Sequence, residues 1–298
     1  MNIEENNKDR SRTKPSSQPI VRIDSLLPKD MAHQAEEIGI KKVNMDFFSL
    51  SGLSILAGSF IALGAIFATV ALTGTSSMHW GWGRIIAGTV FSLGLILVVI
   101  GGAELFTGNN LVIMAWSDRR FSTIKLLRSW VIVYIGNFLG AILTALIVFL
   151  SKQYTFNNGS IGVTALDIAN SKVHLDFVQA IMLGTLCNAL VCLAVWLCFS
   201  ARTTLDKISA IIFPIAAFVA SGFEHCIANM YFIPIALFIK EWAPSSFWQT
   251  AGISSVSYSS LSWNAFFLCN LLPVTIGNMI GGVVLVGSAY WLIYLRRK

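Results

Sequence analysis

Charged residues are scarce in this sequence. Asp, Glu, Lys and Arg make up 12% of the 298 residues, whereas about 25% is usual for a soluble domain. Hydrophobic residues make up 55%, and many of them lie in runs long enough to cross a lipid bilayer. This composition excludes an ordinary soluble domain and predicts an all-α integral membrane protein.

The signatures of metal-dependent and nucleophilic enzymes are also missing. The sequence contains no His-Glu-x-x-His motif and no evident Ser and His pair at catalytic spacing. Its cysteines show no metal-ligand spacing and are expected to be small packing residues. They are Cys187, Cys192, Cys198, Cys226 and Cys269. We therefore expect no enzymatic activity, no metal and no cofactor.

Six apolar stretches predict six transmembrane helices, which places both termini on one side of the membrane. The stretches begin near Phe47, Arg84, Ser129, Phe177, Ile208 and Asn264. Nearly all Lys and Arg residues lie in segments on the side of the termini, which the positive-inside rule assigns to the cytoplasm. The exceptions are Arg84, Lys152, Lys172 and Lys240. We expect a multi-pass protein of the cell (inner) membrane without a cleavable signal peptide, whose net charge of +6 reflects topology and not nucleic-acid binding.

A polar interruption divides the fifth apolar stretch. Residues 221–229 contain Glu224 and His225 and separate two apolar pieces, each too short to cross a bilayer alone. An ionisable group near mid-membrane costs about 2.5 to 3.5 kcal/mol, and non-helical backbone at that depth must be surrounded by protein or a water-filled cavity. The interruption is therefore a candidate functional site.

The second apolar stretch carries a matching interruption at residues 101–110. Two short motifs recur in the same order in both halves of the chain. They are Gly102-x-Glu104 with Gly222-x-Glu224, and Ile135-Gly136-Asn137-x-x-Gly140 with Ile276-Gly277-Asn278-x-x-Gly281. These matches predict a 3+3 inverted repeat in which helices 2 and 5 are broken, with a permeation site between the breaks.

The predicted breaks favour a small anion or its conjugate acid, because the N-terminus of a half-helix exposes unpaired N–H groups. Hydrogen-bond donors precede each half-helix. They are Thr107 and Asn109 at the first break, and His225 and Asn229 at the second. We expect Glu104 and Glu224 to accept hydrogen bonds from backbone N–H groups and to hold the loops in shape.

His225 has a reference pKa near physiological pH, so it could couple the passage of a proton to that of an anion. The alternative is a neutral histidine hydrogen-bonded to Thr107 or Asn188. Asn188 itself is either a hydrogen-bonding contact between helices or a pore-lining residue. Bulky apolar residues that precede the breaks are either core or a constriction that excludes hydrated ions. They are Phe91, Leu95 and Phe218.

The predicted organisation has three parts. Residues 1–27 are a polar, disordered cytoplasmic tail, and residues 28–43 are an amphipathic cytoplasmic helix. This helix is either a solvated lead-in or a gate over the mouth of a pore. Residues 44–298 form the six-helix transmembrane channel domain.

Several long motifs resemble the formate/nitrite transporter family, in particular its formate channels. They are Gly102-Ala103-Glu104-Leu105-Phe106-Thr107, Lys172-Val173-His174, Phe218 to Met230, and Pro273-Val274-Thr275-Ile276-Gly277-Asn278. The resemblance implies a homopentamer of aquaporin-like protomers, each with its own pore. It also implies that Thr107 and His225 are a central polar pair supported by Asn188, Asn229 and Glu224. Lys172 would lie outside and attract the anion, and Phe91, Leu95 and Phe218 would form the constrictions.

These observations together predict a formate channel with pH-dependent, proton-coupled passage, in which formate arrives as the anion and crosses as the neutral acid. Nitrite or hydrosulfide passage through the same architecture is the alternative. The expected partners are small monovalent anions, the lipid bilayer, four further copies of the chain and a cytosolic formate-metabolising enzyme. A structural or sensory membrane protein would not require matched breaks with polar groups at mid-depth.

Overall fold

The computed structural model describes residues 24–296, which contain helices and loops only. The predicted disordered tail lies outside this range except for residues 24–27. In chain order the helices that position the site are α1 (Pro28–Val43), α2 (Phe47–Leu72), α3 (Trp80–Gly101), η2 (Gly108–Val112), α4 (Ile113–Ser117), α5 (Thr123–Leu150), α6 (Ser160–Val173), α7 (Phe177–Ser200), α8 (Thr204–Ala220), α9 (Cys226–Trp242), α10 (Ser245–Ala251) and a last helix over Ala265–Leu295 that includes α11 (Leu272–Met279).

Five of these helices are long and apolar enough to cross a membrane, namely α2, α3, α5, α7 and Ala265–Leu295. A sixth is present if α9 and α10, which meet at a bend of 110°, are taken as one span. Large apolar side chains are exposed on the outer surface of the bundle, for example Phe213 and Ile147. Such a surface suits a bilayer because the lipid tails are as apolar as these side chains. Each helix also satisfies its own backbone hydrogen bonds, which the bilayer core cannot do.

Three helices begin earlier than predicted. The third span starts at Thr123 and not near Ser129, because the Ser122 hydroxyl accepts a hydrogen bond from the Lys125 N–H and caps the helix in a polar segment. The second starts at Trp80 and not near Arg84, and α8 starts at Thr204 and not near Ile208. Polar and interfacial residues therefore extend these helices beyond the apolar stretches from which they were predicted.

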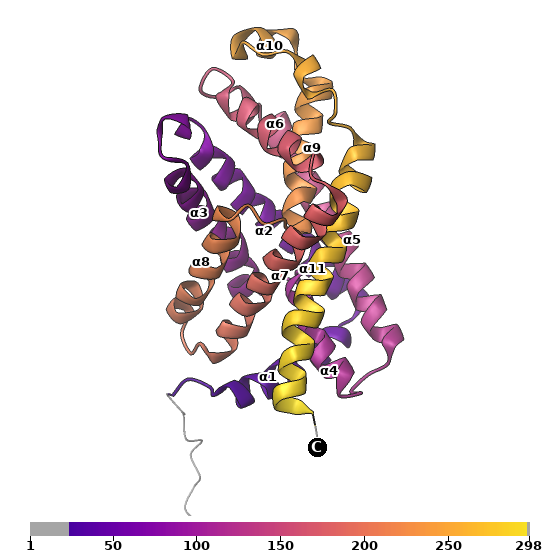
Figure 1. Ribbon diagram of the computed structural model, residues 1–298. Helices are drawn as coiled ribbons and strands as arrows, with labels where there is room; N and C mark the ends of the chain where they lie inside the picture. Colours follow the sequence, from indigo (N-terminus) through magenta and orange to yellow (C-terminus); the bar gives the residue numbers. More distant parts are fainter. Residues whose placement is uncertain (1–23, 297–298) are drawn as a thin grey trace, which may run out of the picture.

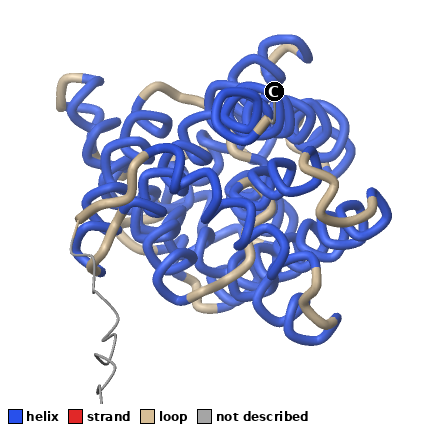
Figure 2. Tube along the Cα trace, turned by 90° about the horizontal axis from the view of Figure 1, so that it is seen from below, coloured by secondary structure: helices blue, strands red, loops and turns tan. Residues whose placement is uncertain are grey.

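The helices form one bundle, and both described ends of the chain lie at the same end of it (Figure 1). Helix α1 contacts the last turns of the chain at that end, whereas α10 lies at the opposite end. Helix α2 packs against α3 and α5, α3 against α8, and α7 against α11. Seen from below, the described residues are helical apart from short loops (Figure 2).

Glycines allow the closest backbone contacts between these helices. A Cβ on Gly140 of α5 would collide with the backbone carbonyl of Ile55 on α2, and a Cβ on Gly277 of α11 would collide with the carbonyl of Ile181 on α7. Both glycines belong to the motif that recurs in the two halves of the sequence. Small residues at such contacts let helix backbones approach each other in a membrane.

The same turn ends α3 and α8. Gly102 and Gly222 have φ angles of +76° and +75° and follow the last helical turns. This left-handed conformation suits glycine, which has no Cβ to clash with the following carbonyl. After the turn, the Glu104 N–H donates to the Leu53 carbonyl and the Glu224 N–H to the Leu183 carbonyl. Each glutamate is thereby held against the span that begins its half of the chain.

Candidate functional site between two cavities

The Thr107 and His225 side chains meet in the interior of the bundle. Thr107 Oγ1 lies 3.1 Å from His225 Nε2, and both residues are buried. His225 is the residue that precedes α9, and its Nδ1 accepts a hydrogen bond of 3.1 Å from the Ala228 N–H. Because a backbone N–H can only donate, Nδ1 carries no proton in this arrangement.

The neutral ring therefore carries its proton on Nε2 and donates it to Thr107 Oγ1. This leaves the Thr107 hydroxyl hydrogen free to point at a third group, since a threonine hydroxyl donates one hydrogen bond and accepts others. The N-terminus of α9 also lies beside the ring, where the helix dipole favours negative charge. The pair can thus offer hydrogen bonds to a small anion.

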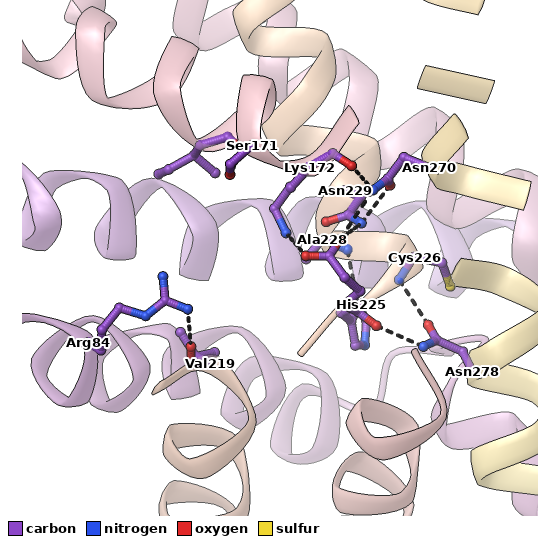
Figure 3. Close-up of polar contacts among 12 residues, drawn as sticks. Arg84, Ser171, Lys172, Val219, His225, Cys226, Ala228, Asn229, Asn270 and Asn278 are labelled. Atoms are coloured by element: carbon purple, nitrogen blue, oxygen red, sulfur yellow. Dashed lines mark hydrogen bonds and ion pairs between the residues drawn. The ribbon is translucent and has the colours of Figure 1, made fainter. Parts of the chain in front are cut away.

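Glu224 lies at the centre of a hydrogen-bonded cluster that includes Lys172, Asn229 and Asn270, which are labelled beside His225 in Figure 3. Its carboxylate accepts 2.7 Å hydrogen bonds from Lys172 Nζ and Asn229 Nδ2, and a 3.2 Å bond from Asn270 Nδ2. Asn270 also donates to the Lys172 carbonyl. The Glu224 residue is 4% exposed, so the lysine compensates a buried charge.

Glu104 has an equivalent cluster. Its carboxylate lies 2.8 Å from Lys42 Nζ and accepts a 2.7 Å hydrogen bond from Asn109 Nδ2. Lys42 Nζ also donates to Asn109 Oδ1 at 2.7 Å. The expectation that Glu104 and Glu224 bind backbone N–H groups was therefore wrong: an ammonium and amide side chains satisfy both carboxylates, because a buried charge needs a charged partner.

Asn137 and Asn278 hydrogen-bond to the backbone of the turns that follow Gly102 and Gly222. Asn137 on α5 accepts from the Phe106 N–H and donates to the Glu104 carbonyl. Asn278 on α11 makes the same bonds to the Cys226 N–H and the Glu224 carbonyl. All four distances are 2.9 Å. These contacts explain why the asparagine occupies the same place in both copies of the sequence motif.

Aromatic rings cover the His225 side of the site. The Phe218 ring lies 5.7 Å from Phe91 in an edge-on arrangement and 5.9 Å from the His225 ring. Phe232 stacks on Phe91 at 6.5 Å and also lies beneath the Lys172 ammonium. Phe232 was not predicted, since one phenylalanine in an apolar helix gives no signal by its position.

Two cavities adjoin this centre, one lined by Leu105 and Gly108 near Thr107 and the other by His225. The first, here called the Lys42 cavity, has a volume of about 270 Å³ and is lined by Lys42, Leu95 and Glu104 among others. The second, called the Lys172 cavity, has a volume of about 210 Å³. Its lining includes Arg84, Phe91, Lys172, Phe218, Glu224 and His225. The apolar residues Leu95 and Phe91, one turn apart on α3, line different cavities.

Lys172 lies elsewhere than the resemblance implied, and Asn188 makes the contacts between helices that were one of its two alternatives. Lys172 is not a free outer charge: its ammonium is paired with Glu224 and its side chain is only 14% exposed. Asn188 makes no hydrogen bond to Thr107 or His225. It donates to Asn110 Oδ1 at 2.8 Å and to the Asn278 carbonyl at 2.7 Å.

Lys42 and Asn270 are site residues that the sequence reasoning missed. A signal for Lys42 was present, because Lys-Val precedes Asp-Phe by the same spacing at residues 42–47 and 172–177. Asn270 had no counterpart motif. Within residues 24–296, no three His, Cys, Asp or Glu side chains gather so that they could hold a metal ion.

The recurring motifs, the cavities and the polar pair can be compared with known proteins. A sequence model described as formate/nitrite transporter matches residues 29–292. The chain belongs to the formate/nitrite transporter family. The chain is 45% identical to the formate channel FocA of Escherichia coli K12 over 92% of its own length and 96% of that protein. Its identity to FocA of Haemophilus influenzae is 40%, over 88% and 93% of the two chains.

Solved structures of this family have the same fold. A structure described as a pentameric formate channel with formate bound matches 84% of this chain and 98% of that chain, with a TM-score of 0.79 and 44% identity. An FNT family ion channel matches 89% and 98% with a TM-score of 0.75 and 25% identity. The expected membership of the formate/nitrite transporter family is confirmed.

Proposed function

We propose that this protein is a pentameric formate channel or transporter of the inner membrane, with a pore through each protomer. The observation that carries the proposal is the arrangement of Thr107 and His225 between two cavities that each contain a lysine. Identity of 45% to a formate channel over almost the whole chain supports formate as the substrate. The likeness to a pentameric formate channel supports five copies of the chain.

The protomer is proposed to be a 3+3 inverted repeat in which two helices are interrupted, one after α3 at Gly102 and the other between α8 and α9 at Gly222. The two clusters support this, because Lys42, Glu104 and Asn109 repeat the contacts of Lys172, Glu224 and Asn229. The Lys and Arg distribution supports cytoplasmic termini. The α1 end of the bundle, with the Lys42 cavity, would then face the cytoplasm, where a formate-metabolising enzyme would act.

The proposed path begins with attraction of the anion. Each cavity is lined by two cationic side chains and one carboxylate, so each has one positive charge in excess when His225 is neutral. In the Lys172 cavity the cations are Arg84 and Lys172. A cavity of low dielectric concentrates such a field and raises the local concentration of anions.

The path then passes the Thr107 and His225 pair, where formate would bind as the anion. Transfer of the Nε2 proton to formate leaves the ring neutral only if Nδ1 has gained a proton. A proton on Nδ1 would displace the Ala228 N–H. We therefore expect proton coupling to be accompanied by loosening of the first turn of α9.

The apolar side chains complete the proposed pathway. Phe91 and Phe218 line the Lys172 cavity and Leu95 lines the Lys42 cavity. A ring of apolar groups excludes a hydrated anion, whereas a neutral acid of the same size loses little hydration on passing it. Asn229 and Glu224 would hold Lys172 in place, and Asn188 would fix the spacing of α7 against α11.

Nitrite or hydrosulfide is the second candidate substrate, because the family is named for both formate and nitrite and the polar pair offers hydrogen bonds to any small monovalent anion. Purified protein in liposomes distinguishes the candidates. We expect formate uptake faster than in protein-free vesicles and weaker competition by nitrite or hydrosulfide than by unlabelled formate. Uptake equal to that of protein-free vesicles would refute a formate channel. Stronger competition by nitrite than by unlabelled formate would make nitrite the preferred candidate substrate.

A further inference from the structure

Among the described residues that line the two cavities, Lys207 is the one cation without a hydrogen-bond or ion-pair partner for its side chain. The Lys42 cavity contains Lys42, Lys207 and Glu104 as its charged residues. The Lys42 ammonium is bonded to Glu104 and Asn109. Among residues 24–296, the Lys207 ammonium has no carboxylate within ion-pair distance and donates no hydrogen bond to a protein group.

The stability of α8 does not explain Lys207. It is the fourth residue of the helix, in the first turn, where the helix dipole favours negative charge and disfavours a cation. The adjacent Asp206 supplies the favourable charge there, and its carboxylate accepts hydrogen bonds from the N–H groups of Arg202 and Thr203. Asp206 therefore caps the helix and is not a partner of Lys207.

Arg84 is the second cation of the Lys172 cavity, as Lys207 is of the Lys42 cavity, but the Arg84 side chain is hydrogen-bonded to backbone carbonyls. Its guanidinium donates to the Val219 carbonyl at 3.0 Å (Figure 3) and to the Ala220 carbonyl at 3.3 Å, at the C-terminal end of α8. Lys207 lies in the same cavity as Gly102, at the C-terminal end of α3, yet donates to no carbonyl there. The ammonium of Lys207 is thus available to a ligand.

We propose that Lys207 is the anion-docking group of the Lys42 cavity, where it binds a small monovalent anion before that anion reaches Thr107 and His225. This inference rests on the proposed function and assigns a substrate-binding residue to it. One anion neutralises the single positive charge that remains after Lys42 pairs with Glu104. The rest of the lining is largely apolar, with Leu95, Val98 and Leu105, so the charge of Lys207 is screened less than in bulk water.

Removing the Lys207 charge should affect formate entry from one side of the membrane only. Lys207 lines the Lys42 cavity only, so its removal should weaken docking from that side and leave docking from the Lys172 side unchanged. A partly exposed ion pair contributes about 0.2 to 1 kcal/mol. The half-saturating formate concentration should therefore rise by up to about fivefold. The maximal rate should not change, because the constriction and the polar pair are untouched.

Membrane vesicles of known orientation test the proposal. The full-length chain is expressed in cells without formate channels of their own, and labelled formate uptake is measured in inside-out and right-side-out vesicles. Inside-out vesicles present the Lys42 cavity to the medium in the proposed orientation. We expect Lys207→Gln to raise the half-saturating concentration by up to about fivefold, in inside-out vesicles only. Lys207→Arg should behave as the unsubstituted chain.

Lys41→Gln is the matched control, since Lys41 is an exposed neighbour of Lys42 that does not line the cavity. Equal behaviour of Lys207→Gln and Lys41→Gln in inside-out vesicles would overturn the proposal. An equal rise in both vesicle types, or loss of docking in Lys207→Arg as well, would show a structural role and overturn it too. Uptake by the unsubstituted chain no faster than by vesicles without it would instead refute the proposed function, and this inference with it.

Discussion

Replacement of Glu224 by Gln should destabilise the protein by leaving Lys172 without its charge partner. The Glu224 carboxylate accepts hydrogen bonds from Lys172, Asn229 and Asn270, and the Lys172 side chain is 14% exposed. Glutamine keeps the size of the side chain and removes its charge. The ammonium would then face an amide inside the bundle, and the two asparagines would lose a charged acceptor.

Removing one partner of a buried ion pair costs about 3 to 5 kcal/mol. We expect the lower end of this range, because Lys172 lines a cavity that water can reach. A change of 1 kcal/mol shifts the midpoint of thermal unfolding by about 2 to 4 °C in a domain of this approximate size. The purified Glu224→Gln protein in detergent should therefore unfold about 6 to 12 °C below the unsubstituted protein.

A double variant tests whether the unpaired Lys172 charge causes the loss of stability. In Glu224→Gln/Lys172→Met the unpaired charge is gone, so the unfolding midpoint should recover most of the loss. Glu104→Gln is the matched variant in the other cluster and should cost less, because the Lys42 side chain is 25% exposed. A double variant less stable than Glu224→Gln alone would show that the charge of Lys172 is not what destabilises the single variant.

Three further predictions concern packing, selectivity and pH. Gly140→Ala should lower the unfolding midpoint by several degrees, because its methyl group would meet the Ile55 carbonyl. Phe218→Ala should raise the leak of larger carboxylates such as acetate in liposome flux, and unchanged selectivity would exclude Phe218 from the constriction. Burial raises the pKa of Glu36, which pairs with Arg120. Docked α1 therefore binds more protons than released α1, and protease sensitivity of α1 should increase as pH rises.

The apolar runs and the repeated motifs made the membrane helices predictable from the sequence. Thr107 and His225 follow the repeated Gly-x-Glu motif at different spacings, three residues and one residue after the glutamate, and the resemblance to the formate/nitrite transporter family implied that they form a pair. The structure puts their side chains 3.1 Å apart. Both residues lie in or next to the turns that carry the family's motifs, so the resemblance was enough to pair them.

The partners of the glutamates could not be predicted in the same way. Lys42 is 62 residues from Glu104 and Lys172 is 52 residues from Glu224, so each pairing depends on where α1 and α6 lie in the folded bundle. The same holds for Asn270, which reaches Glu224 from the last helix. Long-range packing decides these contacts, and the sequence alone specified only that the buried carboxylates need partners.

Simultaneous records of formate uptake and internal pH in liposomes test the central claim most directly. An inward formate gradient should give uptake faster than in protein-free vesicles, together with acidification of the interior. The His225→Phe protein should lose this proton-coupled import and can retain passive efflux, since the cavities remain. Formate uptake with the same internal acidification in His225→Phe would contradict a pathway that transfers its proton at the Thr107 and His225 pair.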